Sequence, residues 1–360
     1  MLDDLPILGI AGRSGSGKTT LMEALLPRLA ARGLAVAVAK FHAHGIDVDR
    51  PGKDSDRLFR AGADVYLAGP DQAFTRLHPA GAIAPAVRLA DLAARYDLVL
   101  VEGRETLACR KVWLLADGET RPPAAAGDPV ACLRRDADRL AAVSDLLDDW
   151  LPRQWLRTPV YGCILIGGQS SRMGKPKHLL RSGQSGGKTW LERTAAHLAR
   201  VAERVVIVGA GAVPQALADA MRLPDAPGLA GPMSGILAAL RWAPQASWLV
   251  AACDLPDLGG EALAWLLATR RPGVWATLPR LAPGGGVEPL LAHYDFRIRA
   301  AIEDLAAAGR FSPSLLAEHP KVACPTPPDA LRPAWENVNT PDDLARTRRS
   351  RRTKSRRPAT

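Results

Sequence analysis

The sequence has few cysteines, and they stand singly. The five are Cys109, Cys132, Cys163, Cys253 and Cys324. No C-x-x-C pair occurs among them, so the spacing supports neither a zinc knuckle nor a disulfide framework. Aromatic residues are also scarce, at 5% of the chain, whereas the hydrophobic fraction of 47% is ordinary for a globular protein.

Long apolar runs are missing as well. No stretch approaches the roughly 18 consecutive apolar residues that a membrane-spanning helix needs. The first ten residues, MLDDLPILGI, carry acidic side chains where a secretory signal needs positive charge, and their apolar run is too short. We therefore expect a cytoplasmic protein with no membrane partner.

Acidic residues are absent from the last fifteen positions, RTRRSRRTKSRRPAT, eight of which are Arg or Lys. Removing these eight charges from the formal net charge of +10 leaves about +2, which is near neutral for a chain of this size. A terminal block of like charge is typically a solvated, disordered tail. The near-neutral body disfavours nucleic acid as a partner.

The 360 residues are enough for two domains. A proline-containing stretch from Leu146 to Pro159 precedes a new apolar strand, which predicts domains at 1–150 and 160–346, a linker at 151–159 and a tail at 347–360. Both halves alternate continuous apolar strands with helices. This pattern favours an α/β fold of two three-layer domains with mostly parallel sheets, whose ligands bind at the carboxyl ends of the strands.

The first glycine-rich loop, GRSGSGKT at 12–19, matches the spacing G-x-x-x-x-G-K-[ST] completely. It follows an apolar strand at 7–11 and precedes a helix with leucines on one face, which is the context of a P-loop. Backbone N–H groups of such a loop surround phosphates at a helix N-terminus. The expected nucleotide-binding residues are Gly12, Arg13, Ser14, Gly15, Ser16, Gly17, Lys18, Thr19 and Thr20.

A later segment, YDLVLVEG at 96–103, contains a short apolar strand that ends at Glu102, where P-loop proteins place an acid for magnesium or its water. Thr19 and Glu102 are therefore the expected Mg²⁺ ligands of the first half. The stretch FHAHGIDVDRPGKDSDR at 41–57 also contains His42, His44 and two nearby aspartates. Its spacing matches no established zinc geometry, which favours a polar loop beside the nucleotide over a metal site.

Three segments of the first half, GRSGSGKTTL, HAHGIDVDRPGKDSDRLFRAGA and DLVLVEG, together resemble the MobB family of molybdopterin-guanine dinucleotide biosynthesis adaptors. The resemblance covers about 5–145 and implies a GTP-binding helper with a P-loop NTPase-like fold. Relatives commonly have a second histidine where this chain has Phe41, and a lysine near Arg104.

The second glycine-rich loop, GGQSSRMGKPK at 167–177, lacks the P-loop spacing and follows a fresh strand at 162–166. Its paired glycines allow a nucleotide to approach the backbone closely, and Arg172 and Lys177 supply positive charge to a triphosphate. Further on, the strand WLVAACDLP ends at Asp254. A role as a mere turn cap is the less favoured interpretation of Asp254.

The string L-x-G-G-x-S-x-R-M-G-x-x-K resembles the MobA family of molybdenum cofactor guanylyltransferases over about 160–346. The resemblance implies a Rossmann-like nucleotidyltransferase fold, with Arg172, Lys177 and Asp254 as catalytic residues and Asp254 as the Mg²⁺ ligand. The implied GTP-binding residues are Leu165, Ile166, Gly167, Gly168, Ser171, Arg172, Lys177, Asp225 and Asp254. It also implies pterin-side contacts from Gly235, Asn337 and Asn339, although both asparagines are common turn formers.

The two resemblances predict a bifunctional molybdenum cofactor biosynthesis protein. Its C-terminal domain would transfer GMP from GTP to molybdopterin with Mg²⁺ and release pyrophosphate, while Asp225 would serve base recognition or the metal's outer shell. Molybdoenzymes and other proteins of cofactor biosynthesis are the implied partners. One alternative is another transferase, either a molybdenum cofactor cytidylyltransferase or a sugar-1-phosphate nucleotidyltransferase. The paired glycines disfavour the cytidylyltransferase. The other alternative is a non-catalytic carrier or scaffold.

Overall fold

The computed structural model describes residues 2–41, 48–78, 84–103, 106–167, 176–181, 187–340 and 343. The chain divides into two compact units, Met1–Gln154 and Trp155–Thr360. Each unit is built on its own mostly parallel sheet, which confirms the predicted α/β class. The basic tail lies outside the described residues.

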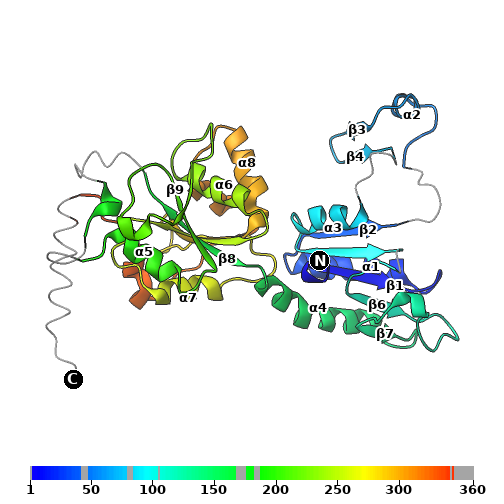
Figure 1. The fold of residues 1–360 in the computed structure, drawn as a ribbon. Coiled ribbons are helices and arrows are strands. Elements are labelled where there is room, and N and C mark those ends of the chain that lie inside the picture. Colours follow the sequence, from blue (N-terminus) through cyan, green and yellow to red (C-terminus); the bar gives the residue numbers. More distant parts are fainter. Residues whose placement is uncertain are drawn as a thin grey trace, which may run out of the picture. The chain divides into compact units, whose positions relative to one another are not determined.

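A five-stranded parallel sheet forms the centre of the N-terminal unit (Figure 1). In spatial order its strands are β2 (Val36–Lys40), β5 (Leu98–Glu102), β1 (Ile7–Ala11), β6 (Lys111–Leu114) and β7 (Ala131–Leu133). Strands β1 and β5 are buried at every position, as their continuous apolar sequences require for a sheet covered on both faces. The carboxyl ends of β1, β2 and β5 meet at one edge.

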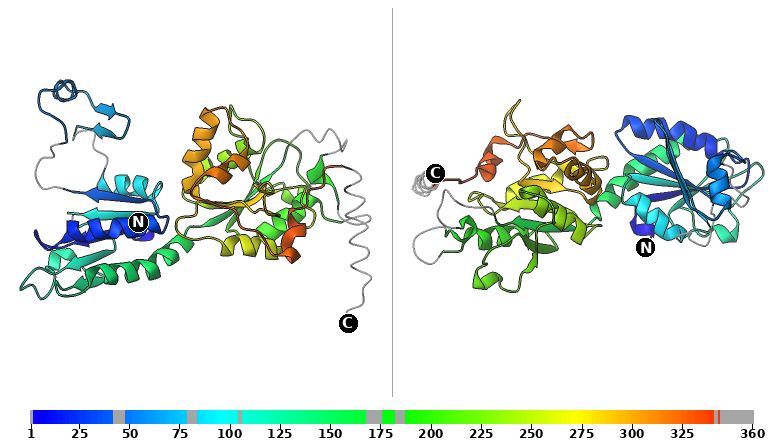
Figure 2. Two further views of the ribbon diagram at one scale, coloured as in Figure 1. Left: turned by 180° about the vertical axis from the view of Figure 1, so that it is seen from behind. Right: turned by 90° about the horizontal axis from the view of Figure 1, so that it is seen from above.

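Helices cover both faces of this sheet. Because successive residues of a strand point to opposite faces, neighbouring residues contact different helices. Leu8 and Leu100 pack with α1 (Lys18–Ala31) and α4 (Arg139–Leu156). Their neighbours Ile7 and Val99 pack instead with α3 (Pro85–Ala93) on the other face. Figure 2 shows the same layering from behind and from above.

Helix α4 contains Pro152 and continues to Leu156, so the expected linker at 151–159 is helical in its first part. The boundary between the two units falls inside this helix, between Gln154 and Trp155. Burial explains why the helix extends so far, because Leu151 is 1% exposed and Trp155 is 2% exposed.

The stretch from 48 to 78 forms a small module. It consists of α2 (Asp54–Arg60) and a two-stranded antiparallel sheet of β3 (Val65–Ala68) and β4 (Ala73–Arg76). A two-stranded sheet is marginal alone and needs further support, which here comes from a network of charged side chains that links α2 to β4.

The C-terminal unit contains a seven-stranded sheet (Figure 1). Its strands are, in spatial order, β10 (Met221–Leu223), β9 (Arg204–Val208), β8 (Val160–Leu165), β11 (Ser247–Ala252), β13 (Leu291–Tyr294), β12 (Ala276–Thr277) and β14 (Val322–Ala323). Strand β13 alone among them runs antiparallel to its neighbours. Its start therefore lies beside the end of β11, where Leu291 pairs with Ala251.

This sheet is also covered on both faces. Helices α5 (Trp190–Leu198) and α7 (Gly260–Ala268) pack on one face, and α6 (Pro232–Trp242) and α8 (Arg299–Ala307) pack on the other. Helix α5 begins with a capping box: the Thr189 side chain accepts the Glu192 N–H, and the Glu192 carboxylate accepts the Thr189 N–H. The described 3₁₀ segments are Leu2–Asp4, Ala124–Ala126, Lys177–Leu179, Gln215–Leu217, Phe296–Ile298, Pro313–Glu318 and Asp329–Trp335.

Candidate functional site

The first glycine-rich loop joins the end of β1 to the start of α1, as its sequence predicts. Gly12, Gly15 and Gly17 all have positive φ angles, of 147°, 75° and 89°. At Gly12 a Cβ atom would lie 2.6 Å from the Leu114 carbonyl oxygen, so a larger residue cannot be accommodated there. The loop thus needs glycine to turn tightly against β6 and then enter the helix.

Lys18 binds back onto its own loop. Its Nζ donates hydrogen bonds to the carbonyl oxygens of Gly12, at 2.7 Å, and Arg13, at 2.8 Å. These contacts hold the ammonium group inside the curve of the loop. Ser16 is 1% exposed, and its hydroxyl has no hydrogen-bond partner within the described chain. A buried hydroxyl of this kind inside a phosphate-type loop fits a polar ligand.

Thr19 and Glu102 meet across the sheet edge. The Thr19 hydroxyl donates to Glu102 Oε1 at 3.4 Å, and Lys40 Nζ at the end of β2 lies 3.3 Å from Glu102 Oε2. The Glu102 side chain is only 9% exposed, so its charge is held mainly by Lys40. A hydroxyl and a carboxylate are hard oxygen donors, and the pair fits the Mg²⁺ that a nucleotide site requires.

The side chains of the other predicted residues of the first half form no hydrogen bond or ion pair with Thr19 or Glu102 in the described part of the chain. Arg13 Nε lies 3.2 Å from Glu119, whose pKa is lowered by the Ala116 N–H, the Trp113 indole and Arg13 itself. Ser14, Gly15 and Thr20 are exposed. Arg104, His42, His44 and Asp47 lie outside the described residues.

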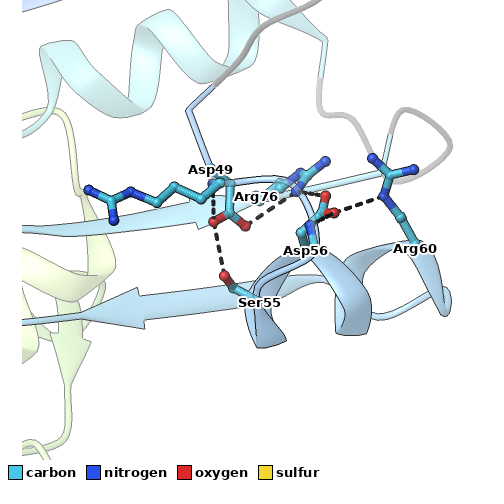
Figure 3. Close-up of polar contacts among 7 residues, drawn as sticks. Asp49, Ser55, Asp56, Arg60 and Arg76 are labelled. Atoms are coloured by element: carbon cyan, nitrogen blue, oxygen red, sulfur yellow. Dashed lines mark hydrogen bonds and ion pairs between the residues drawn. The ribbon is translucent and has the colours of Figure 1, made fainter.

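The rest of the DVDRPGKDSDR stretch forms an internal network rather than an open ligand set (Figure 3). Arg76 on β4 donates to both Asp49, at 3.3 Å, and Asp56, at 3.0 Å. Asp56 also accepts the Gly52 N–H and Arg60 Nε, and Asp49 accepts the Ser55 hydroxyl. The two carboxylates therefore hold the module of α2, β3 and β4 together. Arg76 was not among the predicted residues, because nothing in the local sequence pairs it with an acid 20 positions earlier.

The second site lies at the carboxyl end of β11. Lys177 Nζ lies 2.9 Å from Asp254 Oδ2 and 2.6 Å from Asn339 Oδ1. Side-chain exposures of 17% for Lys177 and 18% for Asp254 place the ion pair in a partly buried position. Three of the predicted residues thus come together from segments far apart in the chain.

Backbone contacts fix the positions of these three side chains. The Val338 N–H donates to the Asp254 carbonyl at 3.1 Å, which ties the segment carrying Asn339 to the end of β11. The Asp343 carboxylate accepts the N–H groups of Asn339 and Thr340. The buried His178, next to Lys177, places Nε2 2.8 Å from the Ala212 carbonyl. The sequence offered no signal for His178.

Asp225 belongs to a separate contact group at the ends of β8 and β9. It accepts the Ser234 hydroxyl at 2.9 Å. A Cβ atom at Gly235 would lie 2.6 Å from Leu165 and 3.4 Å from Asp225, so Gly235 is a close-packing position. Gly209 is more restricted still, because its Cβ would lie 1.9 Å from the Ile166 carbonyl.

Of the remaining predicted residues, Gly167 has a φ of 101°, Ile166 is 5% exposed and Leu165 ends β8. Asn337 is exposed. Gly168, Ser171 and Arg172 lie outside the described residues.

Among the residues that the structure describes, Asp254 is the carboxylate in contact with Lys177. Burial and the adjacent Asp254 raise the pKa of the Cys253 thiol to about 12, so this neighbouring thiol is neutral near pH 7. Within the described chain, no group of three or more His, Cys, Asp or Glu residues forms a metal cluster. One carboxylate fits a Mg²⁺ ion that takes its other ligands from phosphates and water.

The chain thus carries two candidate sites, a P-loop motif at the end of β1 and a lysine–aspartate pair at the end of β11. The chain belongs to the MobB and MobA families: residues 7–132 match the model of molybdopterin guanine dinucleotide synthesis protein B, and residues 162–322 match the MobA-like NTP transferase domain. The prediction of a nucleotidyltransferase joined to a MobB-like part is thereby confirmed.

Individual relatives agree with this division. The molybdopterin-guanine dinucleotide biosynthesis adapter protein of Haemophilus influenzae is 34% identical over 167 residues, covering 42% of this chain and 92% of the relative. The probable molybdenum cofactor guanylyltransferase of Pelotomaculum thermopropionicum is 35% identical over 193 residues, covering 52% and 91%. A molybdenum cofactor biosynthesis bifunctional protein of Synechocystis is 36% identical over 141 residues, covering 38% and 40%.

None of the helices in the described ranges is both long and apolar enough to cross a membrane.

Proposed function

We propose that the C-terminal unit transfers GMP from GTP to the phosphate of molybdopterin, forming molybdopterin guanine dinucleotide and pyrophosphate. The observation that carries the proposal is the meeting of Lys177, Asp254 and Asn339 at the end of β11. The similarity to a probable molybdenum cofactor guanylyltransferase over 91% of that relative supports the choice of substrates. We expect the reaction to take place in the cytoplasm, where GTP is available.

The chemistry needs charge neutralisation more than it needs a base. An acceptor phosphate oxygen attacks the α-phosphorus of GTP, and the bond from that phosphorus to the oxygen bridging to the β-phosphate breaks. Two unit charges 4 Å apart repel by about 4 kcal/mol at an effective dielectric of 20. Mg²⁺, when bound, would supply positive charge to the phosphates, and Asp254 would hold it.

Lys177 is the described cation best placed to act on the phosphates. Its ammonium group is held by one carboxylate and one amide oxygen, so it is oriented at the strand end. Asn339 accepts from Lys177 rather than contacting Asp254, which makes it a positioning residue for the lysine. Gly167 follows β8 and Asp225 follows β10, which lie on either side of β9 in the same sheet, and we expect the purine to bind at this edge.

We further propose that the N-terminal unit binds GTP through the P-loop and assists its covalently linked partner. Lys18 would contact the β- and γ-phosphates, while Thr19 and Glu102 would hold Mg²⁺. Joining the two units in one chain raises their effective concentration to about the millimolar range.

The decisive experiment incubates the purified full chain with GTP, Mg²⁺ and molybdopterin. Pyrophosphate release is measured, and the pterin product is identified by its mass. A product heavier by one GMP residue supports the proposal. Parallel reactions with CTP or with sugar 1-phosphates test the other transferases: preferential turnover of either would overturn the choice of substrates. Absence of pyrophosphate with every nucleotide would favour a carrier.

A further inference from the structure

One arginine outside the glycine loop contacts the loop from the start of α4. Arg139 is the first residue of this helix, and its guanidinium donates to the Ser16 carbonyl at 2.6 Å. The same side chain donates to the carbonyls of Leu115, at 2.6 Å, Leu133, at 3.1 Å, and Arg134, at 2.8 Å. It therefore joins the P-loop to the ends of β6 and β7.

The contact with Ser16 fixes a peptide plane. A trans peptide places the carbonyl of one residue and the N–H of the next on opposite sides. Because Arg139 holds the Ser16 carbonyl on its own side, the Gly17 N–H points away from Arg139. Gly17 is the N-cap of α1 in a left-handed conformation, where backbone N–H groups bind phosphate.

Arg139 itself is well anchored. Its helix buries Val143 and Leu147 in the same core as Leu21 and Leu25 of α1, so the guanidinium is fixed relative to the helix that follows the loop. Gly17 lies close to it, since a Cβ there would be 3.5 Å from Nη1. Only a planar group with several donors can bind four carbonyls at once.

We propose that Arg139 is a positioning residue of the nucleotide site, which holds the Ser16–Gly17 peptide so that the Gly17 N–H faces a bound phosphate. The inference rests on the proposed binding of GTP by the N-terminal unit. Arg139 does not touch the nucleotide itself; it acts through the backbone of the loop.

The test measures the dissociation constant of a fluorescent GTP analogue and of the matching GMP analogue for the full chain. Arg139→Gln is expected to weaken GTP binding at least tenfold and GMP binding less, because GMP lacks the β-phosphate that the N–H groups of a P-loop contact. Arg139→Lys, which keeps the charge and some of the contacts, is expected to recover part of the loss. The matched control is Arg135→Gln, which removes the same charge from the surface pair with Asp117 and should change GTP binding less than twofold.

Each outcome decides the matter. Wild-type GTP affinity in a folded Arg139→Gln protein would overturn the inference, as would an equal loss in Arg135→Gln, which would point to net charge alone. If Arg139→Gln does not fold, as judged by circular dichroism, Arg139→Lys decides, and unchanged affinity there refutes the positioning role. If the wild-type chain and Lys18→Ala both fail to bind GTP, the proposed function of the N-terminal unit fails and this inference fails with it.

Discussion

Lys177 and Asp254 lie 2.9 Å apart although 77 positions separate them in the chain. Asp254 follows the end of β11, whereas Lys177 begins the 3₁₀ segment Lys177–Leu179, and each side chain is mostly shielded from solvent. Salt screens a pair in such a position less than it screens an exposed one. The two charges compensate each other at a strand end that, under the proposed function, receives a triphosphate and its metal.

Asp254→Asn is expected to lower pyrophosphate release by about 100-fold or more, because it removes the only carboxylate that the described site offers to Mg²⁺. The measurement is steady-state turnover with GTP and molybdopterin. Glu261→Gln, an exposed acid at the start of α7, is the matched control and should keep full activity. Turnover of Asp254→Asn within threefold of wild type would contradict the assignment.

Lys177→Met is expected to lower kcat/KM by about 100-fold, since the oriented cation is lost. Lys177→Arg restores the charge but not the compact ammonium geometry, and should recover only part of the rate. Asn339→Ala leaves the Lys177–Asp254 pair intact, so its loss should be smaller, about tenfold. If Asn339→Ala proved more damaging than Lys177→Met, the asparagine could not be a mere positioning residue for the lysine.

Glu102→Gln should remove the Mg²⁺ dependence of GTP binding by the N-terminal unit, because the amide replaces the anion beside Thr19. The dissociation constant of GTP is measured with Mg²⁺ and again with EDTA. In the wild type the two values should differ, and in the variant they should converge. Glu23→Gln, on the exposed face of α1, should behave as the wild type.

The module of α2, β3 and β4 should loosen only in strong acid. The Gly52 N–H and Arg76 lower the pKa of Asp56 to about 2, from an ordinary value of 3.8. A lowered pKa in the folded state stabilises the fold above pH 3.8, and this contribution disappears as the pH falls toward 2. The Gly52 amide resonance, followed by NMR from about pH 6 downward, should report a midpoint near 2. A midpoint at the ordinary aspartate value would show that the network in Figure 3 does not form.

His293 should make the C-terminal unit sensitive to mild acid. Burial and the nearby Arg270 lower its pKa to about 3, and neither ring nitrogen has a partner within the described chain. The unfolded histidine binds a proton below about pH 6.5, so stability falls as the pH drops from 6.5 toward 3. His293→Leu removes the unpaired nitrogens and should raise the free energy of unfolding at about pH 5 by about 1–3 kcal/mol. Urea unfolding in mildly alkaline and mildly acidic buffer provides the test: an unchanged pH slope in the variant would contradict this role of His293.

The sequence predicted the parts of the sites that are local. A strand followed by glycines and a helix is a local pattern, so the position of Lys18 at the start of a helix follows from the sequence, as do those of Glu102 and Asp254 at strand ends. The prediction of Lys177 required the whole sequence motif around it, because a single lysine in a loop does not indicate a function. The family resemblance supplied Asn339.

What the sequence could not predict depends on packing between distant segments. Arg139 reaches the P-loop from 123 positions away, and an arginine at the start of a helix has no distinguishing periodicity. The expectation of a linker relied on prolines, whereas the buried Leu151 and Trp155 keep α4 helical past Pro152. The antiparallel direction of β13 was likewise invisible, because its four residues read like any buried strand.

The separation of 162 positions between Lys177 and Asn339 has a consequence for biosynthesis of the protein. On the ribosome the lysine emerges long before the asparagine that orients it, and Trp335, whose indole N–H donates to the Leu291 carbonyl of β13, also emerges late. A growing chain therefore completes the P-loop unit first and the transferase site much later. A translation product that stops before position 336 would retain the former and lack the latter.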